Sequence, residues 1–271
     1  VVCLSAGTAA VHLALIGCGV GPGDEVCVQS YTFCASSHPI TYLGAKPIFI
    51  GSEKETWNMD PELLEKAILD RKEKTGKYPK AIVPVALYGM PYHIDKILAI
   101  ADKYGIPVVE DAAEGMGSRF NGQMTVLDAH IAHHKHVQSL YEELLADVPG
   151  VHIHKQPADP RFDANFWLCA ATLDPEVRIQ GQENAYKEVI KTAVGGAAGV
   201  IHQVDSATTD CQTHANDEAL RVFMLGKNIE ARPTWKPMHK QPVYEGASVY
   251  TNGVERTSSR LASACRPVHM L

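Results

Sequence analysis

Small residues precede an apolar helical run near the beginning of the chain. The stretch Ser5-Ala6-Gly7-Thr8-Ala9-Ala10 leads directly into Val11–Ile16. A turn of small residues that opens a helix presents free backbone N–H groups and the positive end of the helix dipole. Such a turn can bind an anion, and the hydroxyl of Thr8 can add a donor. An ordinary helix start has the same pattern, so both interpretations stay open at this point.

An acidic residue follows a short apolar stretch further along. Asp111 comes after Ile106–Val109 and Glu110, and ligands of open α/β sheets bind beyond the carboxyl ends of the strands. A carboxylate there can hold the protonated ring nitrogen of a pyridine cofactor. A solvated loop acid or a helix cap is the alternative. Phe33 can stack on a flat ring, or it can be a core residue that follows a strand.

Four histidines fall within one predicted helix: His130, His133, His134 and His136. The i, i+4 spacing of His130 and His134 can grip a metal ion. No acidic ligand pattern such as H-E-x-x-H accompanies them, so we favour solvated imidazoles on a helix and predict no metal site.

Alternating strands and helices are predicted around these residues. Strands are expected at Glu25–Gln29, Lys46–Ile50, Ala81–Leu87 and Ile106–Val109. One helix is expected to begin at Pro61, with Asp60 as its N-cap, and a second helix is expected at Ile94–Tyr104. This order predicts a mostly parallel sheet covered by helices. After Gln123 we expect helices at Leu127–Ala146, Glu183–Ala193 and Ala215–Gly226, and a strand at Asn165–Leu173.

Composition narrows the class of protein. The 271 residues are 45% hydrophobic and 21% charged, which is typical of a globular protein with a real core. A net charge of −6 does not favour nucleic acid or an anionic membrane as partner. The seven cysteines form no C-x-x-C pair and mostly lie in apolar stretches. We therefore expect reduced thiols and a cytoplasmic location.

Taken together, these motifs resemble a known family. Their order is the small-residue turn, G-x-G-P-G-D-E-V, Tyr31-Thr32-Phe33, Leu87-Tyr88-Gly89 and the V-V-E-D-A-A stretch at Val108–Ala113. The chain resembles the DegT/DnrJ/EryC1/StrS family of pyridoxal-phosphate-dependent sugar aminotransferases, from Val1 to Gln123 and again from Met124 to about Glu255. The resemblance implies fold type I, in which a mostly parallel sheet flanked by helices is joined to a smaller C-terminal α+β domain, here incomplete.

The resemblance also implies a binding site for pyridoxal 5'-phosphate. Gly7, Thr8 and Ala9 would hold the cofactor phosphate, and Phe33 would stack on the pyridine ring. Asp111 would pair with the ring nitrogen.

Further positions match the family's pattern near the cofactor and the sugar. Glu114 lies where many members place Gln or His near the ring hydroxyl. Arg232 and His239, within the C-terminal signature Gly226–Tyr244, would approach a sugar-nucleotide substrate. Ala86 departs from the polar residue that often precedes L-Y-G, so that contact is not expected. The resemblance further implies a homodimer and an amino-acid donor.

The segment that carries the family's Schiff-base lysine is missing. The family continues from a sequence like Arg119–Gln123 into a glycine-rich strand and an S-F-x-x-x-K loop, whereas here Gln123 runs directly into Met124. Lys135 lies on the histidine-rich helix and is not expected to replace the lost lysine. We therefore predict an internal deletion and no catalytic residue in the remaining chain.

The ends and the division of the chain are also unusual for the family. Val1 opens in the middle of a pattern, so we expect a truncated N-terminus. The tail from about 257 does not match the family, and a one-base frame change near Arg256 would explain it. Residues 1–123 are expected to form a partial cofactor-binding domain, and residues 124–271 a small C-terminal domain.

Three functions follow from these expectations. The chain is a transaminase acting on a nucleotide-linked keto sugar, or a pseudoenzyme that binds the cofactor or a partner weakly, or a gene product that folds poorly. The loss of the lysine favours a chain without transaminase activity.

Overall fold

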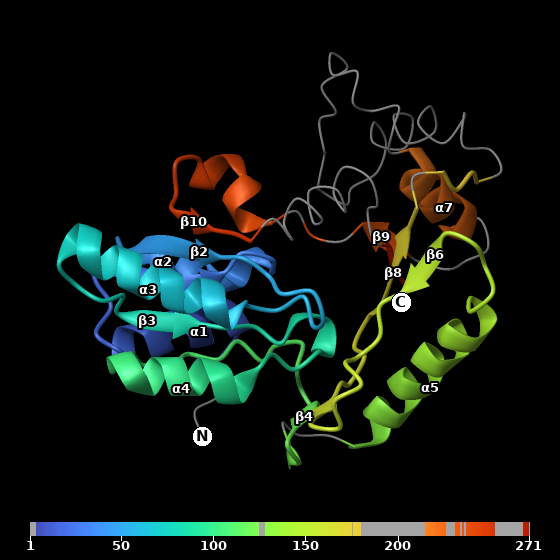
Figure 1. Cartoon of the computed structure of the whole chain (residues 1–271), viewed down its shortest axis with the longest axis horizontal. Coiled ribbons are helices and arrows are strands. Elements are labelled where there is room, and N and C mark those ends of the chain that lie inside the picture. Colours follow the sequence, from blue (N-terminus) through green and yellow to red (C-terminus); the bar gives the residue numbers. More distant parts are fainter. Residues whose placement is uncertain are drawn as a thin grey trace. The chain divides into compact units, whose positions relative to one another are not determined.

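The computed structural model describes most of the chain, in residues 4–124, 128–174, 176–179, 215–225, 231–233, 235, 237–252 and 268–270. The chain divides into two compact units (Figure 1). The first unit contains Val1–His136, Lys155–Trp167 and Trp235–Glu255. The second contains Val137–His154, Leu168–Thr234 and Arg256–Leu271. The first unit therefore takes in three stretches that follow residue 123: residues 124–136, Lys155–Trp167 and Trp235–Glu255.

The first unit is built on a parallel sheet with the strand order β10-β2-β1-β3. Its strands are β1 (Glu25–Gln29), β2 (Lys46–Ile50), β3 (Ala81–Val83) and β10 (Val249–Tyr250). β1 and β2 have the predicted bounds. The third predicted strand ends at Val83, shorter than expected, because Leu87–Gly89 forms the 3-10 turn η2, in which Tyr88 has a φ of 55°.

The predicted strand at Ile106–Val109 adds to the sheet only through isolated bridges. Val108 pairs with Ile82, and Asp111 pairs with Val85, both in the parallel direction. This stretch lies on the far side of β3 from β1 and carries Asp111 at its carboxyl end, as the sequence predicted.

Helices cover both faces of this sheet. One face packs against α1 (Gly7–Gly17) and α2 (His38–Tyr42), in a core that includes Leu15, Ile40 and Val28. The other face packs against α3 (Pro61–Thr75) and α4 (Ile94–Tyr104), in a second core that includes Cys27. Neighbouring residues of β1 thus enter opposite cores, as strand geometry requires. Short 3-10 turns complete the unit: η1 (Cys34–Ser36), η4 (Met238–Lys240) and η5 (Pro242–Tyr244).

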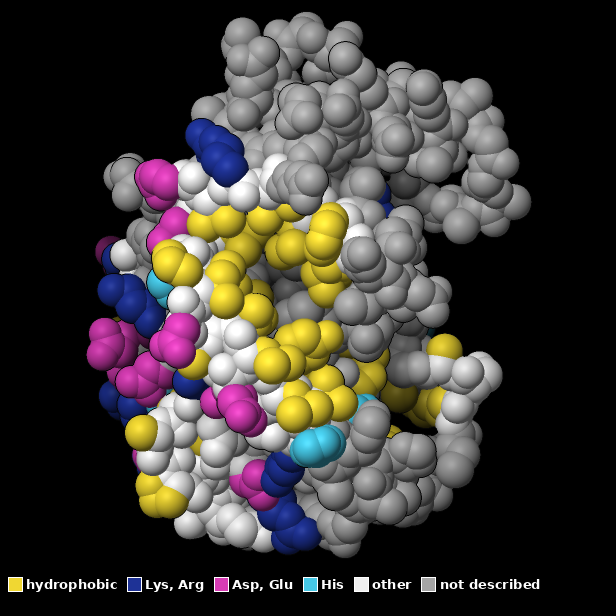
Figure 2. All heavy atoms as spheres, turned by 90° about the vertical axis from the view of Figure 1, so that its right-hand side faces the viewer, with side chains coloured by type: hydrophobic (Ala, Val, Ile, Leu, Met, Phe, Trp, Pro, Cys, Tyr) yellow, Lys and Arg dark blue, Asp and Glu magenta, His cyan; other side chains and the backbone are white. Residues whose placement is uncertain are grey.

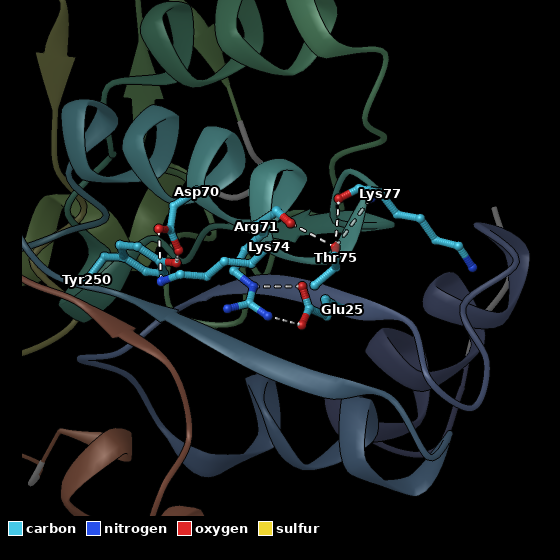
Figure 3. Close-up of polar contacts among 7 residues, drawn as sticks. All are labelled: Glu25, Asp70, Arg71, Lys74, Thr75, Lys77 and Tyr250. Atoms are coloured by element: carbon cyan, nitrogen blue, oxygen red, sulfur yellow. Dashed lines mark hydrogen bonds and ion pairs between the residues drawn. The ribbon is translucent and has the colours of Figure 1, made fainter.

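Helix α3 is fixed at its start and along its length. The carboxylate of Asp60 accepts the N–H groups of Glu62 and Leu63, so it is the predicted N-cap. Arg71 makes two hydrogen bonds to Glu25 of β1, at 2.9 Å and 2.7 Å (Figure 3). The hydroxyl of Tyr250 on β10 donates to Asp70 of the same helix. These contacts connect the edge strand β10 to α3.

A tight hairpin lies where the sequence predicted the internal deletion. Strands β4 (Arg119–Phe120) and β5 (Gln123–Met124) pair in antiparallel fashion, and β4 also pairs with β7 (Phe162–Asp163). Asn121 and Gly122 connect β4 and β5 with φ values of 51° and 76°. Positive φ at both positions is the geometry of a type I′ turn.

The second unit contains an antiparallel sheet with the order β6-β8-β11-β9. Its strands are β6 (Val151–Ile153), β8 (Cys169–Leu173), β9 (Ala231–Pro233) and β11 (Val268–Met270). The strand predicted at Asn165–Leu173 begins later, at Cys169, because Phe166 has a φ of 48°.

Two helices accompany this second sheet. They are α7 (Ala215–Leu225) and α5 (Asp128–Leu144), whose first part belongs to the first unit. Both match predicted helices, while the helix predicted at Glu183–Ala193 and the tail residues 257–267 lie outside the described residues.

The surface, the thiols and the lengths of the helices add three observations. Hydrophobic side chains gather on the face drawn in Figure 2. Cys18, Cys27, Cys34 and Cys169 are free thiols. Within the described part of the chain, no helix has the length and apolar character needed to span a bilayer.

Candidate active site

Asp111 lies at the carboxyl end of the parallel sheet and is held there by backbone and side-chain contacts. Its N–H donates to the carbonyl of Pro84 at 3.0 Å, and its carbonyl accepts the N–H of Ala86 at 3.2 Å. Its carboxylate accepts the hydroxyl of Ser36 at 2.7 Å and the N–H of Ala113 at 3.2 Å. The sheet and η1 therefore fix the direction of this carboxylate.

The donor to Asp111 is itself part of a buried chain of hydroxyls. Ser36 is 1% exposed and Thr32 is fully buried, and their hydroxyl oxygens lie 2.9 Å apart. Because a serine hydroxyl carries one proton and Ser36 gives it to Asp111, Thr32 must be the donor between the two. The chain Thr32–Ser36–Asp111 thus has one direction, which leaves the carboxylate as its final acceptor.

Glu114 is the second acidic group near the sheet edge, and it is buried. Burial raises the pKa of its carboxyl to about 8, and the nearby charge of Asp111 acts in the same direction. The N–H of Tyr88 donates to Oε2 of Glu114 at 2.5 Å, which lowers the pKa but does not outweigh burial. The Glu114 carboxyl therefore holds its proton at neutral pH.

Aromatic rings extend from these acids toward Phe33. The ring of Tyr88 lies 5.2 Å from that of Trp235, and Trp235 lies 5.5 Å from Phe33. Tyr31 makes an edge contact with Tyr88 at 6.2 Å. Phe33 is 53% exposed, so it is not the core residue of the alternative interpretation. The exposed part of its ring can stack on a flat ligand.

The two predicted sugar-site residues have different surroundings. His239, on η4, lies 2.6 Å from the Ser30 hydroxyl through Nδ1, and burial, with the charge of Lys240, lowers its pKa to about 4. His239 is thereby neutral and anchored beside the segment that carries Phe33. Arg232 belongs to β9, where its backbone pairs with His269; its side chain lies outside the described residues.

The turn predicted to bind phosphate forms the start of α1. Helix α1 begins at Gly7, and its N-cap Ala6 gives no side-chain hydrogen bond. In the described part of the chain, no partner occupies the N–H groups of Gly7, Thr8 and Ala9. α1 packs against η1, the turn that carries Ser36. A bare helix N-terminus beside the acid site suits an anionic group.

Several residues that build this site were not singled out from the sequence. Ser36 orients Asp111, Tyr88 and Trp235 provide rings, and the side-chain amide of Asn165 donates to the carbonyls of Glu114 and Met116 at 2.7 Å and 2.8 Å. Trp235 lies within the C-terminal signature Gly226–Tyr244, so the family's motif could have indicated this residue. Asn165 carried no signal of this kind.

Lys135 and the four histidines lie on α5. The ammonium of Lys135 pairs with Asp163 of β7. The side chains of His130 and His133 lie outside the described residues.

Comparison with known proteins identifies the family. Residues 1–126 match the model of the DegT/DnrJ/EryC1/StrS aminotransferase family. EpsN of Bacillus subtilis, named as a pyridoxal phosphate-dependent aminotransferase, is 32% identical over 287 residues, which cover 92% of this chain and 73% of EpsN. This chain belongs to the DegT/DnrJ/EryC1/StrS aminotransferase family. Proteins of this family are pyridoxal phosphate enzymes.

Other relatives in the family act on nucleotide-linked sugars by name. The UDP-2-acetamido-2-deoxy-3-oxo-D-glucuronate aminotransferase of Pseudomonas aeruginosa is 45% identical over 117 residues, which cover 43% of this chain and 31% of that enzyme. GDP-perosamine synthase of Escherichia coli is 29% identical over 273 residues, 89% of this chain and 73% of the synthase.

Solved structures show the same fold. A DegT DnrJ EryC1 StrS aminotransferase from Brucella abortus superimposes with a TM-score of 0.73 at 20% identity, covering 97% of this chain and 78% of that chain. The fold is therefore that of the pyridoxal-phosphate-dependent aminotransferases, as the sequence predicted.

Proposed function

We propose that this chain is a sugar aminotransferase homologue that binds pyridoxal 5'-phosphate without covalent attachment and does not transaminate. One observation carries the proposal: the ring-side acid Asp111 is held and oriented by Ser36, while the sequence passes from Gln123 to Met124 without the family's lysine segment. We infer that the intact enzyme from which this chain derives was a cytoplasmic homodimer that aminated a nucleotide-linked keto sugar with an amino-acid donor.

The remaining residues fit the cofactor. Bound pyridoxal phosphate supplies an electron sink for chemistry at a substrate carbon. In this chain Asp111 would hold the ring-nitrogen proton, and the free N–H groups of Gly7, Thr8 and Ala9 would bind the phosphate. Phe33 would pack on the ring.

Glu114 would act as a donor despite being an acid. Its raised pKa of about 8 keeps the carboxyl protonated at neutral pH. Because Oε2 accepts the N–H of Tyr88, the proton is best placed on Oε1. A protonated carboxyl can donate to a ring hydroxyl oxygen as the amide of Gln would, which is the residue many family members have here.

The alignments support a missing internal piece. The match with EpsN extends over 287 residues, more than the 271 of this chain, although it includes only 92% of the chain. EpsN therefore has residues without a counterpart here. Without the lysine, a base to move the proton between substrate and cofactor is absent from the sequence, and a large share of catalysis is lost.

Cofactor titration and borohydride reduction test the proposal. We expect pyridoxal phosphate to bind reversibly, to be removed by dialysis, and to leave no adduct at a single lysine after borohydride treatment. Asp111→Asn should weaken binding about tenfold or more, because it replaces a charge-assisted hydrogen bond. Asp102→Asn, an exposed acid on α4, is the matched control and should bind as the parent chain does.

Either of two results would overturn this. A stable adduct at one lysine, or turnover with a keto sugar nucleotide, would show that the chain is a working transaminase. Equal affinities of the Asp111→Asn and Asp102→Asn variants would remove the binding site.

A complete transaminase is the second candidate, favoured by the 32% identity over nearly the whole chain. Sequencing the source DNA across Gly122–Met124 distinguishes it. We expect contiguous codons for Gln123 and Met124. An intervening segment with the lysine loop would instead establish an ordinary aminotransferase.

A further inference from the structure

We propose that Glu53, Glu55 and His93 form a binding site for a divalent transition-metal ion such as Zn²⁺. One ligand atom of each residue lies within 4.8 Å of the other two. Imidazole nitrogen and carboxylate oxygen are ligands that zinc accepts at about 2.0–2.2 Å, with water completing a tetrahedron. The site uses none of the residues assigned to the cofactor, so it is independent of the proposed function.

His93 is the observation that points to a ligand. Its side chain is 92% buried, since only 8% of the residue is exposed, and its Nδ1 has no hydrogen-bond partner among the described residues. A buried polar atom without a partner destabilises the fold. A neutral imidazole with its proton on Nε2 would present a free lone pair at Nδ1, which is what a metal ion requires.

The backbone and the ring of His93 each have a contact that fixes them. Its backbone carbonyl accepts the N–H of Ile97 at 3.0 Å in the first turn of α4. Its ring makes an edge contact with Phe162, with the centroids 5.2 Å apart and the planes at 87°. A ring fixed in this way loses little rotational freedom when it binds an ion.

Glu53 is similarly positioned before any ion arrives. Its Oε1 accepts the N–H of Thr56 at 2.9 Å, and its Oε2 accepts the N–H of Glu55 at 2.6 Å. Oε1 also accepts the hydroxyl of Thr56, whereas Oε2 keeps a second lone-pair direction and remains able to bind a metal. Glu55 is exposed and supplies the ligand on the solvent side, where an ion can enter.

Asn58 brings the two halves of the site together. Its Nδ2 donates to the carbonyl of Met90 at 2.8 Å, and its Oδ1 accepts the N–H of Leu87 at 3.0 Å. The loop with Glu53 and Glu55 is thereby fixed against the segment that ends at His93. A bound ion would cross-link the β2–α3 loop to the start of α4.

Calorimetric titration of the EDTA-treated full chain with Zn²⁺ alone tests the site. We expect one binding event that is weakened at least tenfold by Glu53→Gln, Glu55→Gln and His93→Asn, because each removes a ligand. His152→Asn is the control, since that exposed histidine pairs with Asp174 and both residues belong to the second unit. The Co²⁺-loaded chain should show a tetrahedral visible absorption spectrum that disappears in the same three variants.

The histidine-rich helix is the competing source of Zn²⁺ binding. A variant with His130, His133, His134 and His136 all changed to Gln should keep the binding event. If that variant loses it while Glu55→Gln retains the parent affinity, the proposal is overturned. Glu55 is exposed, so its variant tests the site even where His93→Asn fails to fold.

Discussion

Asp111 and Glu114 lie three positions apart and have opposite surroundings. Asp111 receives a hydroxyl and an N–H donor, whereas Glu114 is buried and receives a single N–H. Two carboxyl groups placed so differently can perform different tasks, one as an acceptor for a ring N–H and the other as a protonated donor. The proposal for Glu114 depends on that proton, which makes its pH dependence a direct test.

Replacing Glu114 with Gln should remove a loss of stability that develops between about pH 4.3 and about pH 8. The pKa of Glu114 is about 8 when folded, against roughly 4.3 for a free glutamate. Between these values the folded chain binds a proton that the unfolded chain has released. The free energy of unfolding therefore falls as pH rises from about 4.3 to about 8, by at most about 1.4 kcal/mol per pH unit.

Urea unfolding of the parent chain and of Glu114→Gln at about pH 5.5 and about pH 8.5 measures this effect. Relative to the parent chain, the free energy of unfolding of Glu114→Gln should be higher at the higher pH than at the lower pH. His239 titrates in the opposite sense, but it is present in both proteins and cancels. Equal pH slopes for the two proteins would show that Glu114 is ionised when folded.

Gly89 should tolerate alanine poorly. Its φ is +83°, and an added Cβ would lie 1.6 Å from Oδ1 of Asn165. Gly76 provides a matched control, because its φ is +74° and an added Cβ meets nothing within 4 Å. The free energy of unfolding of Gly76→Ala should fall by about 1–2 kcal/mol, because alanine is strained in the left-handed backbone conformation. Gly89→Ala should lose at least about 2 kcal/mol more, because Asn165 must move.

Unfolding midpoints of both glycine variants check this expectation. Asn165 also donates to the carbonyl of Glu114, so Gly89→Ala should weaken cofactor binding as well, whereas Gly76→Ala should not. Similar losses of stability in the two variants would mean that the close approach of Gly89 and Asn165 is relaxed at little cost.

At the scale of elements, local signals were enough for much of the first unit. The bounds of β1, β2 and α4 agree with prediction, because apolar runs and their flanking Gly residues are read within a few positions. Asp60-Pro61 similarly marked the start of α3, since a capping carboxylate acts on N–H groups two and three residues away.

Other features depended on contacts that no short window contains. The end of β3 is set by the left-handed Tyr88, whose N–H binds Glu114, 26 positions later. Ser36 and Asp111 are 75 positions apart, so their hydrogen bond could not be predicted from spacing. The Asn121-Gly122 hairpin, in contrast, has a local signal, because Asn-Gly is a strong turn sequence. The family's pattern at Arg119–Gln123 did not by itself indicate a hairpin.

At the scale of the whole chain, the edge of the parallel sheet is the feature most relevant to the internal deletion that we propose. The backbone groups of Pro107, Val109 and Asp111 bond toward β3. Those of Val108 and Glu110 point the other way and have no backbone partner among the described residues. An unpaired edge of this kind favours association with other strands.

Helix α1 shows a related exposure. Leu13 and Ile16 are 49% and 48% exposed on a helix whose Leu15 is fully buried. Both observations are consistent with the internal deletion that we propose, and an unpaired strand edge and exposed apolar side chains predict low solubility.

Inserting a segment with the family's glycine-rich strand and S-F-x-x-x-K loop between Gln123 and Met124 should cover the sheet edge at Val108 and reduce the exposed apolar surface of the first unit. The inserted glycine-rich strand can pair with Val108 and Glu110, so aggregation should fall and the unfolding midpoint should rise. The inserted lysine should give a borohydride-stable adduct with pyridoxal phosphate. Replacing only that lysine with alanine should keep the gain in stability and abolish the adduct. If neither chimera is more stable than the parent chain, the exposed edge at Val108 is not where the missing strand belongs, and the chain folds as a unit of its own.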